Sequence, residues 1–265
     1  LASGGNNNVL LGNIAGTALS TGGDNVAIGY QAMRRATTAA DENIAIGRDS
    51  MGGDWGTNDV NGCVAVGYDT LSGTLTSDAS GTIAIGIQSG KAITSGVANT
   101  VIGYQAANDL TTGGYNTVLG YQALDRATTA ALRNVAIGHQ AMHGNFTTAA
   151  VTDCVAIGVN ALEATLTSVA SGNVAIGKSS QAAITSGGRN TSLGFETLST
   201  ATALSHNVAI GWQTMKDSSA TTSHRNIGIG SFVMDSIGAN VANDNVCIGY
   251  DTGTATTTAD NNILI

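Results

Sequence analysis

The chain contains no proline, only three cysteines, and few charged (11%) or aromatic (4%) residues among its 265. Because proline removes a backbone N–H, its absence suits a fold in which nearly every N–H donates to a neighbouring strand. The cysteines, Cys63, Cys154 and Cys247, form neither an even disulfide framework nor a paired metal-ligand spacing. The four histidines offer no ligand set either. We therefore expect no metal and no cofactor.

Positive charge and long apolar runs are also scarce. Ten Lys and Arg residues stand against 18 Asp and Glu, which gives a net charge of −8. Neutralising phosphates requires clustered basic side chains, so this composition argues against nucleic-acid binding. No apolar run reaches the roughly 18 residues that a transmembrane helix needs. We expect neither a nucleic-acid partner nor membrane insertion in this segment.

What the chain has in abundance is one repeated phrase, Asn-Val-Ala-Ile-Gly. The spacings between successive glycines of this phrase are 17, 18, 20, 19 and 17, and this order of spacings then repeats. Five such coils make a 91-residue super-repeat, which covers 12–102, 103–193 and, incompletely, 194–265. The repeat glycines are Gly12, Gly29, Gly47, Gly67, Gly86, Gly103, Gly120, Gly138, Gly158, Gly177, Gly194, Gly211, Gly230 and Gly249. The chain begins and ends inside this pattern, so we expect a fragment of a longer fibre.

Periods of roughly 17–20 residues without helical spacing indicate a solenoid, in which each coil is one unit stacked on its neighbours. The residues one and three before the glycine are aliphatic or Thr, and alternation along a strand places them on one face. The sequence therefore predicts an all-β, parallel β-solenoid, either a β-roll or a β-helix. We expect about fifteen coils, each of roughly 17–20 residues, forming a single repeat domain over 1–265.

The position two before the glycine is also apolar, mostly alanine. A strand that is apolar on both faces is expected to be buried on both faces. In a narrow solenoid one face is the coil's own interior, so a partner chain is the simplest cover for the other. Because alanine is small, we expect it to permit close approach, and we predict an intertwined or side-by-side homotrimer. The alanines are Ala27, Ala45, Ala65, Ala84, Ala136, Ala156, Ala175 and Ala209.

The position four before the glycine is asparagine in twelve coils. Stacked asparagines can hydrogen-bond from coil to coil as a ladder, and asparagine tolerates the left-handed backbone of tight corners. We predict a structural ladder at one corner of the solenoid, with Cys63, Thr82 and Cys154 as the exceptions. The twelve are Asn8, Asn25, Asn43, Asn99, Asn116, Asn134, Asn173, Asn190, Asn207, Asn226, Asn245 and Asn262.

These repeats resemble two known groups of fibrous proteins. Coils such as Asn25–Gly29 and Asn173–Gly177 are similar to the head repeats of trimeric autotransporter adhesins. The longer form in 116–124, Asn-Thr-Val-Leu-Gly-Tyr-Gln-Ala-Leu, resembles repeats of bacteriophage tail fibres. The adhesin resemblance implies a trimer of parallel β-rolls with these strands buried where three chains meet. It extends over nearly the whole chain.

The two longest coils each carry an aromatic residue eight positions after the glycine, Trp55 and Phe146. Both lie in polar, glycine-containing stretches, 51–62 and 142–153, which we expect to protrude. An exposed ring beside Asp and Asn is a common platform for a sugar, so both are candidate ligand-binding residues. The alternative is that each ring folds back over its own coil or touches a neighbouring chain.

No grouping of nucleophile, base and orienter can be read from the spacing, so we predict that the chain is not an enzyme and has no catalytic residues. The predicted function is that of a structural and adhesive segment of a trimeric extracellular fibre, on a virion as a tail fibre or spike shaft, or on a bacterial surface. Its partners are then two further copies and a host-surface glycan or protein receptor. Alternatives are an autotransporter head, an ice-binding β-solenoid and a glycan depolymerase.

Overall fold

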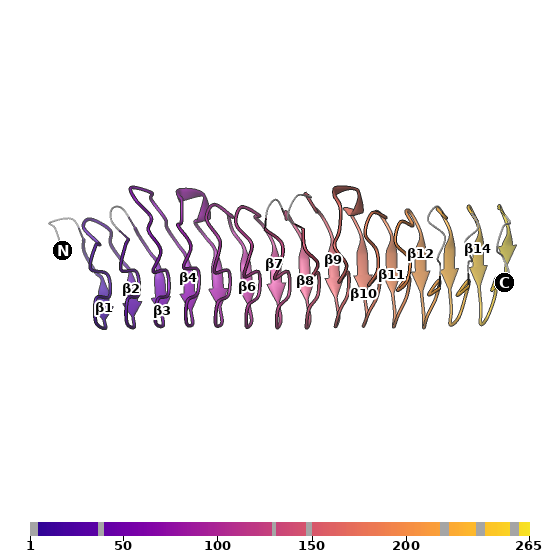
Figure 1. The fold of residues 1–265 in the computed structure, drawn as a ribbon, viewed down its shortest axis with the longest axis horizontal. Coiled ribbons are helices and arrows are strands. Elements are labelled where there is room, and N and C mark those ends of the chain that lie inside the picture. Colours follow the sequence, from indigo (N-terminus) through magenta and orange to yellow (C-terminus); the bar gives the residue numbers. More distant parts are fainter. Residues whose placement is uncertain are drawn as a thin grey trace. The chain divides into compact units, whose positions relative to one another are not determined.

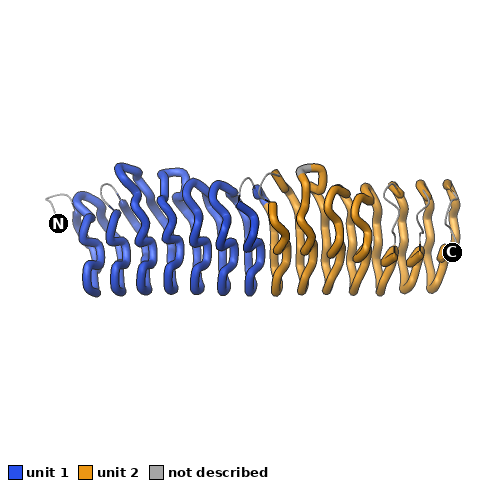
Figure 2. The backbone as a smooth tube through the Cα atoms, in the orientation of Figure 1, with its two compact units in different colours: residues 1–133 blue, residues 134–265 orange. Residues whose placement is uncertain are grey.

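The computed structural model describes residues 5–36, 40–128, 131–146, 150–217, 223–236, 242–254 and 260–265. It is an all-β, parallel β-solenoid, as predicted (Figure 1). The chain divides into two compact units, 1–133 and 134–265 (Figure 2). This boundary falls inside the second super-repeat and not at its edge.

The described strands are short, and each of β1 to β14 ends directly before a repeat glycine. Unit 1 holds β1 (Val9–Leu11), β2 (Val26–Ile28), β3 (Ile44–Ile46), β4 (Val64–Val66), β5 (Ile83–Ile85), β6 (Thr100–Ile102) and β7 (Thr117–Leu119). Unit 2 holds β8 (Val135–Ile137), β9 (Val155–Ile157), β10 (Val174–Ile176), β11 (Thr191–Leu193), β12 (Val208–Ile210), β13 (Ile227–Ile229), β14 (Val246–Ile248) and β15 (Ile263–Leu264). Two short 3-10 turns, η1 (Ser77–Ala79) and η2 (Ser168–Ala170), lie between strands.

Within each unit the strands pair in parallel, in chain order, and like residues stack on like. Val26 pairs with Ile44, and Ala27 pairs with Ala45. The register is unchanged between β3 and β4, although one of the two longest coils separates them. The loops therefore absorb every difference in coil length, and each coil adds one strand in the same register.

The two faces of each strand point in the opposite directions from those that we predicted. The central alanines face the interior: Ala27, Ala45 and Ala84 have no exposed surface. The flanking aliphatic residues point outward, and Ile44 and Ile46 are 37% and 36% exposed. The alanines therefore do not approach a partner chain. The coil is narrow and its interior also holds the segment after the glycine, so the central residue of most strands is alanine; Val101 and Val118 are the largest fully buried residues at this position.

The segment after each glycine turns back into the core through left-handed residues. Gln31 and Met33 have φ of 61° and 49°, and the side chains of Ala32 and Met33 are fully buried. The glycine itself is required for two reasons. Gly103 has a φ of +140°, and a Cβ there would lie 2.3 Å from the carbonyl oxygen of Gly120 in the next coil. Stacking at this point is backbone on backbone.

Asparagine side chains form hydrogen bonds from coil to coil at the corner before the strands. In unit 1, both the backbone N and Nδ2 of Asn116 donate to Oδ1 of Asn99, each at 3.0 Å, and Nδ2 also donates to the carbonyl of Ala131 at 2.7 Å. The left-handed residue is not the asparagine but the one before it, as at Asp24 with φ 58°. Bonds of this kind involve Asn25, Asn43, Asn116, Asn134, Asn173 and Asn207.

A cysteine at this corner keeps the backbone hydrogen bond of the ladder but not the short side-chain hydrogen bonds. The backbone N of Cys154 donates to Oδ1 of Asn134 at 2.9 Å, but its thiol lies 3.5 Å or more from the carbonyls that it meets. Cys63, Cys154 and Cys247 are all buried and free. Burial raises the pKa of all three thiols, which makes them poor nucleophiles.

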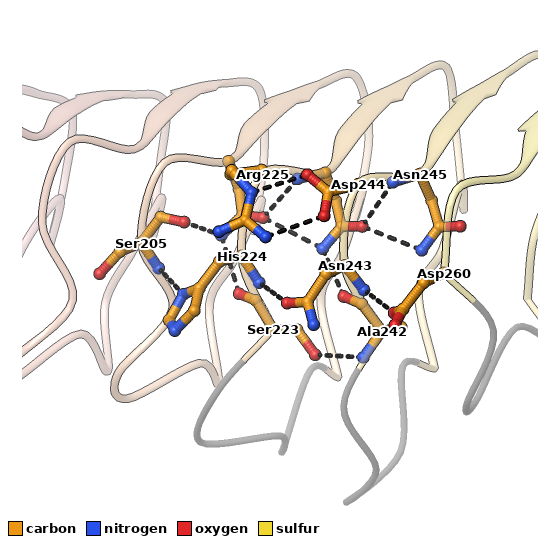
Figure 3. Close-up of polar contacts among 11 residues, drawn as sticks. Ser205, Ser223, His224, Arg225, Ala242, Asn243, Asp244, Asn245 and Asp260 are labelled. Atoms are coloured by element: carbon orange, nitrogen blue, oxygen red, sulfur yellow. Dashed lines mark hydrogen bonds and ion pairs between the residues drawn. The ribbon is translucent and has the colours of Figure 1, made fainter.

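A second ladder, which the sequence analysis did not identify, lies two residues before the asparagines and runs in the opposite direction. Here the backbone N of the earlier coil donates to a side chain of the later one. The backbone N of Ser205 donates to Nδ1 of His224 at 3.1 Å, that of His224 to Oδ1 of Asn243 at 2.8 Å, and that of Asn243 to Oδ1 of Asp260 at 2.6 Å (Figure 3). Because His224 accepts through Nδ1, its ring proton is on Nε2.

Candidate interaction face

The outward residues of the strands form an uncharged face on each unit, which we call the outward face. It consists of the positions one and three before each repeat glycine, and each of these positions is aliphatic except for three Thr residues. Ile83 and Ile85 in unit 1 are both 37% exposed, and Ile227 and Ile229 in unit 2 are both 36% exposed. Exposed apolar side chains gathered on one face make it a candidate interaction site.

The outward face forms because side chains alternate along the strand and the narrow interior holds mostly alanine at the central position. Most of the β-branched residues that favour strands therefore lie outside, and Val101 and Val118 are the buried exceptions. Stacking in register aligns them into two columns of aliphatic side chains per unit. Residue identity is nearly constant along each column, so the surface presents the same chemistry at every coil.

The residue after the glycine forms a third column, which we call the aromatic column because seven of its fourteen residues are Tyr, Phe or Trp; two others, Arg48 and Lys178, are basic. Tyr104 and Tyr121 stack with ring centroids 5.3 Å apart, and Phe195 and Trp212 with centroids 4.2 Å apart. These rings are half exposed: Trp212, for example, is 48% exposed. Stacking fixes their orientation before any partner binds, which lowers the entropic cost of using them in an interface.

A glutamine column follows directly and is joined by side-chain hydrogen bonds. Nε2 of Gln122 donates to Oε1 of Gln105 at 2.9 Å, and Nε2 of Gln105 donates to Oε1 of Gln88 at 3.0 Å. The equivalent column in unit 2 contains Gln213 and Glu196, and Nε2 of Gln213 donates to Oε2 of Glu196 at 2.8 Å. The edge beside the aromatic column is thus polar and ordered.

The two aromatic residues predicted to bind ligands are buried. Trp55 has no exposed surface and Phe146 is 1% exposed, so neither presents a ring to solvent. The loop around Trp55 closes on itself, because the backbone N and Nδ2 of Asn58 both donate to the carbonyl of Trp55. The longest coils enclose more space than the shortest ones, and the large ring fills it. The prediction that these loops offer a sugar platform was wrong.

The structure also brings together two carboxylates that are distant in sequence. The backbone N of Asp109 donates to the carbonyl of Asp125 at 2.9 Å, which places the two residues side by side on neighbouring coils. Burial, together with the negative charge of Asp109, raises the pKa of Asp125 to about 6, while Arg126 acts in the opposite direction. Spacing in the sequence gave no sign of this pair, because the two positions become neighbours only once the coils stack.

The raised pKa of Asp125 predicts a pH-dependent stability. Its carboxyl pKa is higher in the folded chain than in the unfolded chain, so ionisation above about pH 6 opposes folding. Asp125→Asn should raise the free energy of unfolding by about 1–2 kcal/mol at pH 7 and leave it unchanged at pH 3.5. Urea unfolding at both pH values measures the difference. Asp109→Asn is the control, with a smaller gain of the same sign; an equal gain from Asp125→Asn at both pH values contradicts the assignment.

Two surveys of the described residues were negative. No group of three or more His, Cys, Asp or Glu side chains there is arranged to hold a metal ion. Within the same residues, no helix has the length and apolarity to cross a membrane. In comparisons with known proteins, no family model and no curated protein matches the chain.

Proposed function

We propose that the chain is a structural and adhesive segment of a trimeric extracellular fibre, such as the tail fibre or spike shaft of a virion. It contributes about fifteen coils, each of roughly 17–20 residues, to the fibre. In this proposal three copies pack their outward faces around an axis parallel to the coil stack. The observation that supports it is the outward face itself, in which no position is charged.

The regularity of the coils favours further copies of the same chain as the partner. Each coil adds one strand whatever its length, and stacked strands are spaced by about 4.8 Å. Copies related by an axis along the stack therefore keep equivalent residues level with one another. A partner of unrelated sequence has no such match to offer. Aliphatic columns against aliphatic columns also leave no buried charge unpaired.

The proposal applies equally to a fibre on a virion and to one on a bacterial surface, because an autotransporter head would use the same face. The other two alternatives gain less support. An ice-binding surface orders water through aligned Thr residues, whereas the outward face has Thr only at positions 100, 117 and 191. A depolymerase needs carboxylates that face a sugar, whereas Asp125 is 8% exposed. We therefore propose no catalytic role.

Multi-angle light scattering tests the proposal directly. At micromolar concentration the expected mass is three times the 26.4 kDa of one chain. Burial of the outward face should also reduce the solvent accessibility of Trp212, because the aromatic column lies next to the outward positions in the chain. A stable monomer at these concentrations overturns the trimer.

A further inference from the structure

Unit 2 has a groove of about 580 Å³ formed by the segments that precede β9 to β12 and by η2. Its lining includes Val169, Ser171, Ser186, Arg189, Ser205 and His206. This volume falls within the usual range for small-molecule sites. The groove lies wholly within unit 2 and is separate from the outward face.

A guanidinium and an imidazole, those of Arg189 and His206, lie together at this groove. Arg189 and His206 occupy the left-handed position before the corner asparagine in consecutive coils, with φ of 59° and 61°. Nη1 of Arg189 lies 3.3 Å from Nε2 of His206. Since a guanidinium only donates, His206 accepts here through Nε2. In a chain with a net charge of −8 this is a local positive surface.

The next residue of the same column is engaged elsewhere. Arg225 forms a two-point ion pair with Asp244, with Nε and Nη2 at 2.7 and 2.8 Å from the two carboxylate oxygens (Figure 3). It does not line the groove. The structure thus displays the two-point carboxylate recognition that a guanidinium offers, two coils beyond a second arginine, Arg189, that lines the groove.

The rest of the lining suits a sugar. Ser171, Ser186 and Ser205 supply hydroxyl groups, and Oγ of Ser205 accepts a bond from the backbone N of Gly188 at 3.2 Å, which fixes its position. Val169 is 65% exposed and offers an apolar surface for a pyranose ring. Asp153 also lines the groove. Its negative charge disfavours polyanions, and its carboxylate oxygens can accept hydrogen bonds from sugar hydroxyls.

The preceding super-repeat provides an internal comparison. At the equivalent positions of that copy, Ala98 stands in place of Arg189, Tyr115 in place of His206 and Asp78 in place of Val169. Ala98 and Tyr115 have φ of 51° and 60°, so the backbone conformation is the same and only the side chains differ. The Arg189–His206 pair is therefore a feature of this one copy and not a requirement of the repeat.

We propose that this groove binds an acidic saccharide. The sugar carboxylate lies on the Arg189 guanidinium beside His206, the hydroxyls meet the serines, and one ring face lies on Val169. The inference extends the attachment role proposed above by naming its ligand. It does not depend on the trimer, because one chain supplies every group.

Isothermal titration calorimetry of the full chain with two probes, a galacturonic acid trisaccharide and sialyllactose, tests the proposal. At least one probe should bind, and its carboxyl-reduced analogue should bind at least about tenfold more weakly, since a charge-assisted hydrogen bond contributes about 1.5–3 kcal/mol. The Arg189→Ala variant should lose a similar factor. His206→Tyr, which restores the residue of the earlier super-repeat, should weaken binding with the fold intact.

Arg225→Ala is the matched control, because it removes the same charge from the same column outside the groove. It should bind like the unmodified chain. Equal weakening by Arg225→Ala and Arg189→Ala reduces the effect to general electrostatics and overturns the site. Three other results would also overturn the site. They are equal binding of the reduced sugar, tighter binding of an acidic peptide such as hexaglutamate, and no binding of either saccharide. Light scattering of the same samples reports the oligomer separately, so a failure of the groove is distinguishable from a failure of the fibre proposal.

Discussion

Replacing Asn190 with alanine is expected to lower the free energy of unfolding of unit 2 by about 3–5 kcal/mol, from two or more buried groups left without partners. Asn190 is fully buried and its side chain joins three coils. Nδ2 donates to the carbonyl of Leu204 at 2.6 Å and to Oδ1 of Asn173 at 3.1 Å. Oδ1 accepts from the backbone N of Asn207 at 3.0 Å and from Nδ2 of Asn207 at 3.2 Å. Alanine removes all four hydrogen bonds.

Cys154→Ala is the control for this prediction, at the same corner of the same unit. The Cys154 thiol makes only long contacts to carbonyls, so its loss should cost about 1 kcal/mol, mainly from lost packing. Urea unfolding followed by circular dichroism measures both variants. Amide exchange at Asn207 should accelerate in Asn190→Ala and not in Cys154→Ala. Equal losses of stability in the two variants would show that the side-chain hydrogen bonds of the ladder contribute no more to the free energy of unfolding than side-chain packing does.

The repeat made the fold predictable, because a period of roughly 17–20 residues with one apolar strand per coil has few solutions other than a parallel solenoid. The corner asparagines were predictable for a similar reason. A single residue type recurs at a fixed place, and its side chain can donate and accept at once. Coil-to-coil bonds such as those between Asn116 and Asn99 follow from stacking such residues in register.

The direction of the strand faces was not predictable, because both faces are apolar and alternation alone does not say which is inside. The deciding fact is the space available. The turn after the glycine brings Ala32 and Met33 into the interior, and in the narrow space that remains Ala27 is fully buried while Val26 and Ile28 are only partly buried. Residue volume was the available signal, since small residues at one position and β-branched residues on either side indicate a narrow interior.

The second ladder was missed because its members share a function and not an identity. Asp41, Asn61, Ser205 and His224 look unrelated in sequence, yet each accepts a hydrogen bond from the backbone N of the preceding coil. Trp55 was misjudged for a different reason. Polar neighbours suggested a protruding loop, but a longer coil encloses extra volume, and burying one indole fills it with a large gain of apolar contact.

Introducing four carboxylates on the outward face should convert the proposed trimer into single chains without unfolding them. The variant carries Asp in place of the outward residues of β3 and β5, which are 36–37% exposed in the isolated chain. Each carboxylate would be buried against aliphatic groups of the other copies at a cost on the order of 3–5 kcal/mol. Light scattering should report the mass of one chain, with the far-ultraviolet circular dichroism of a β protein retained. The substitutions are Ile44→Asp, Ile46→Asp, Ile83→Asp and Ile85→Asp.

Two further variants separate an interface effect from charge and from misfolding. The first adds the same four negative charges at positions away from the strands, and it should remain trimeric. The second is the single inward substitution Ala84→Asp, which buries a charge inside one coil and should abolish the β spectrum itself. Retention of the trimer by the outward variant, or its loss in the charge control, would mean that the outward face is not where the copies meet. The charge control consists of Thr57→Asp, Ser77→Asp, Thr167→Asp and Thr202→Asp.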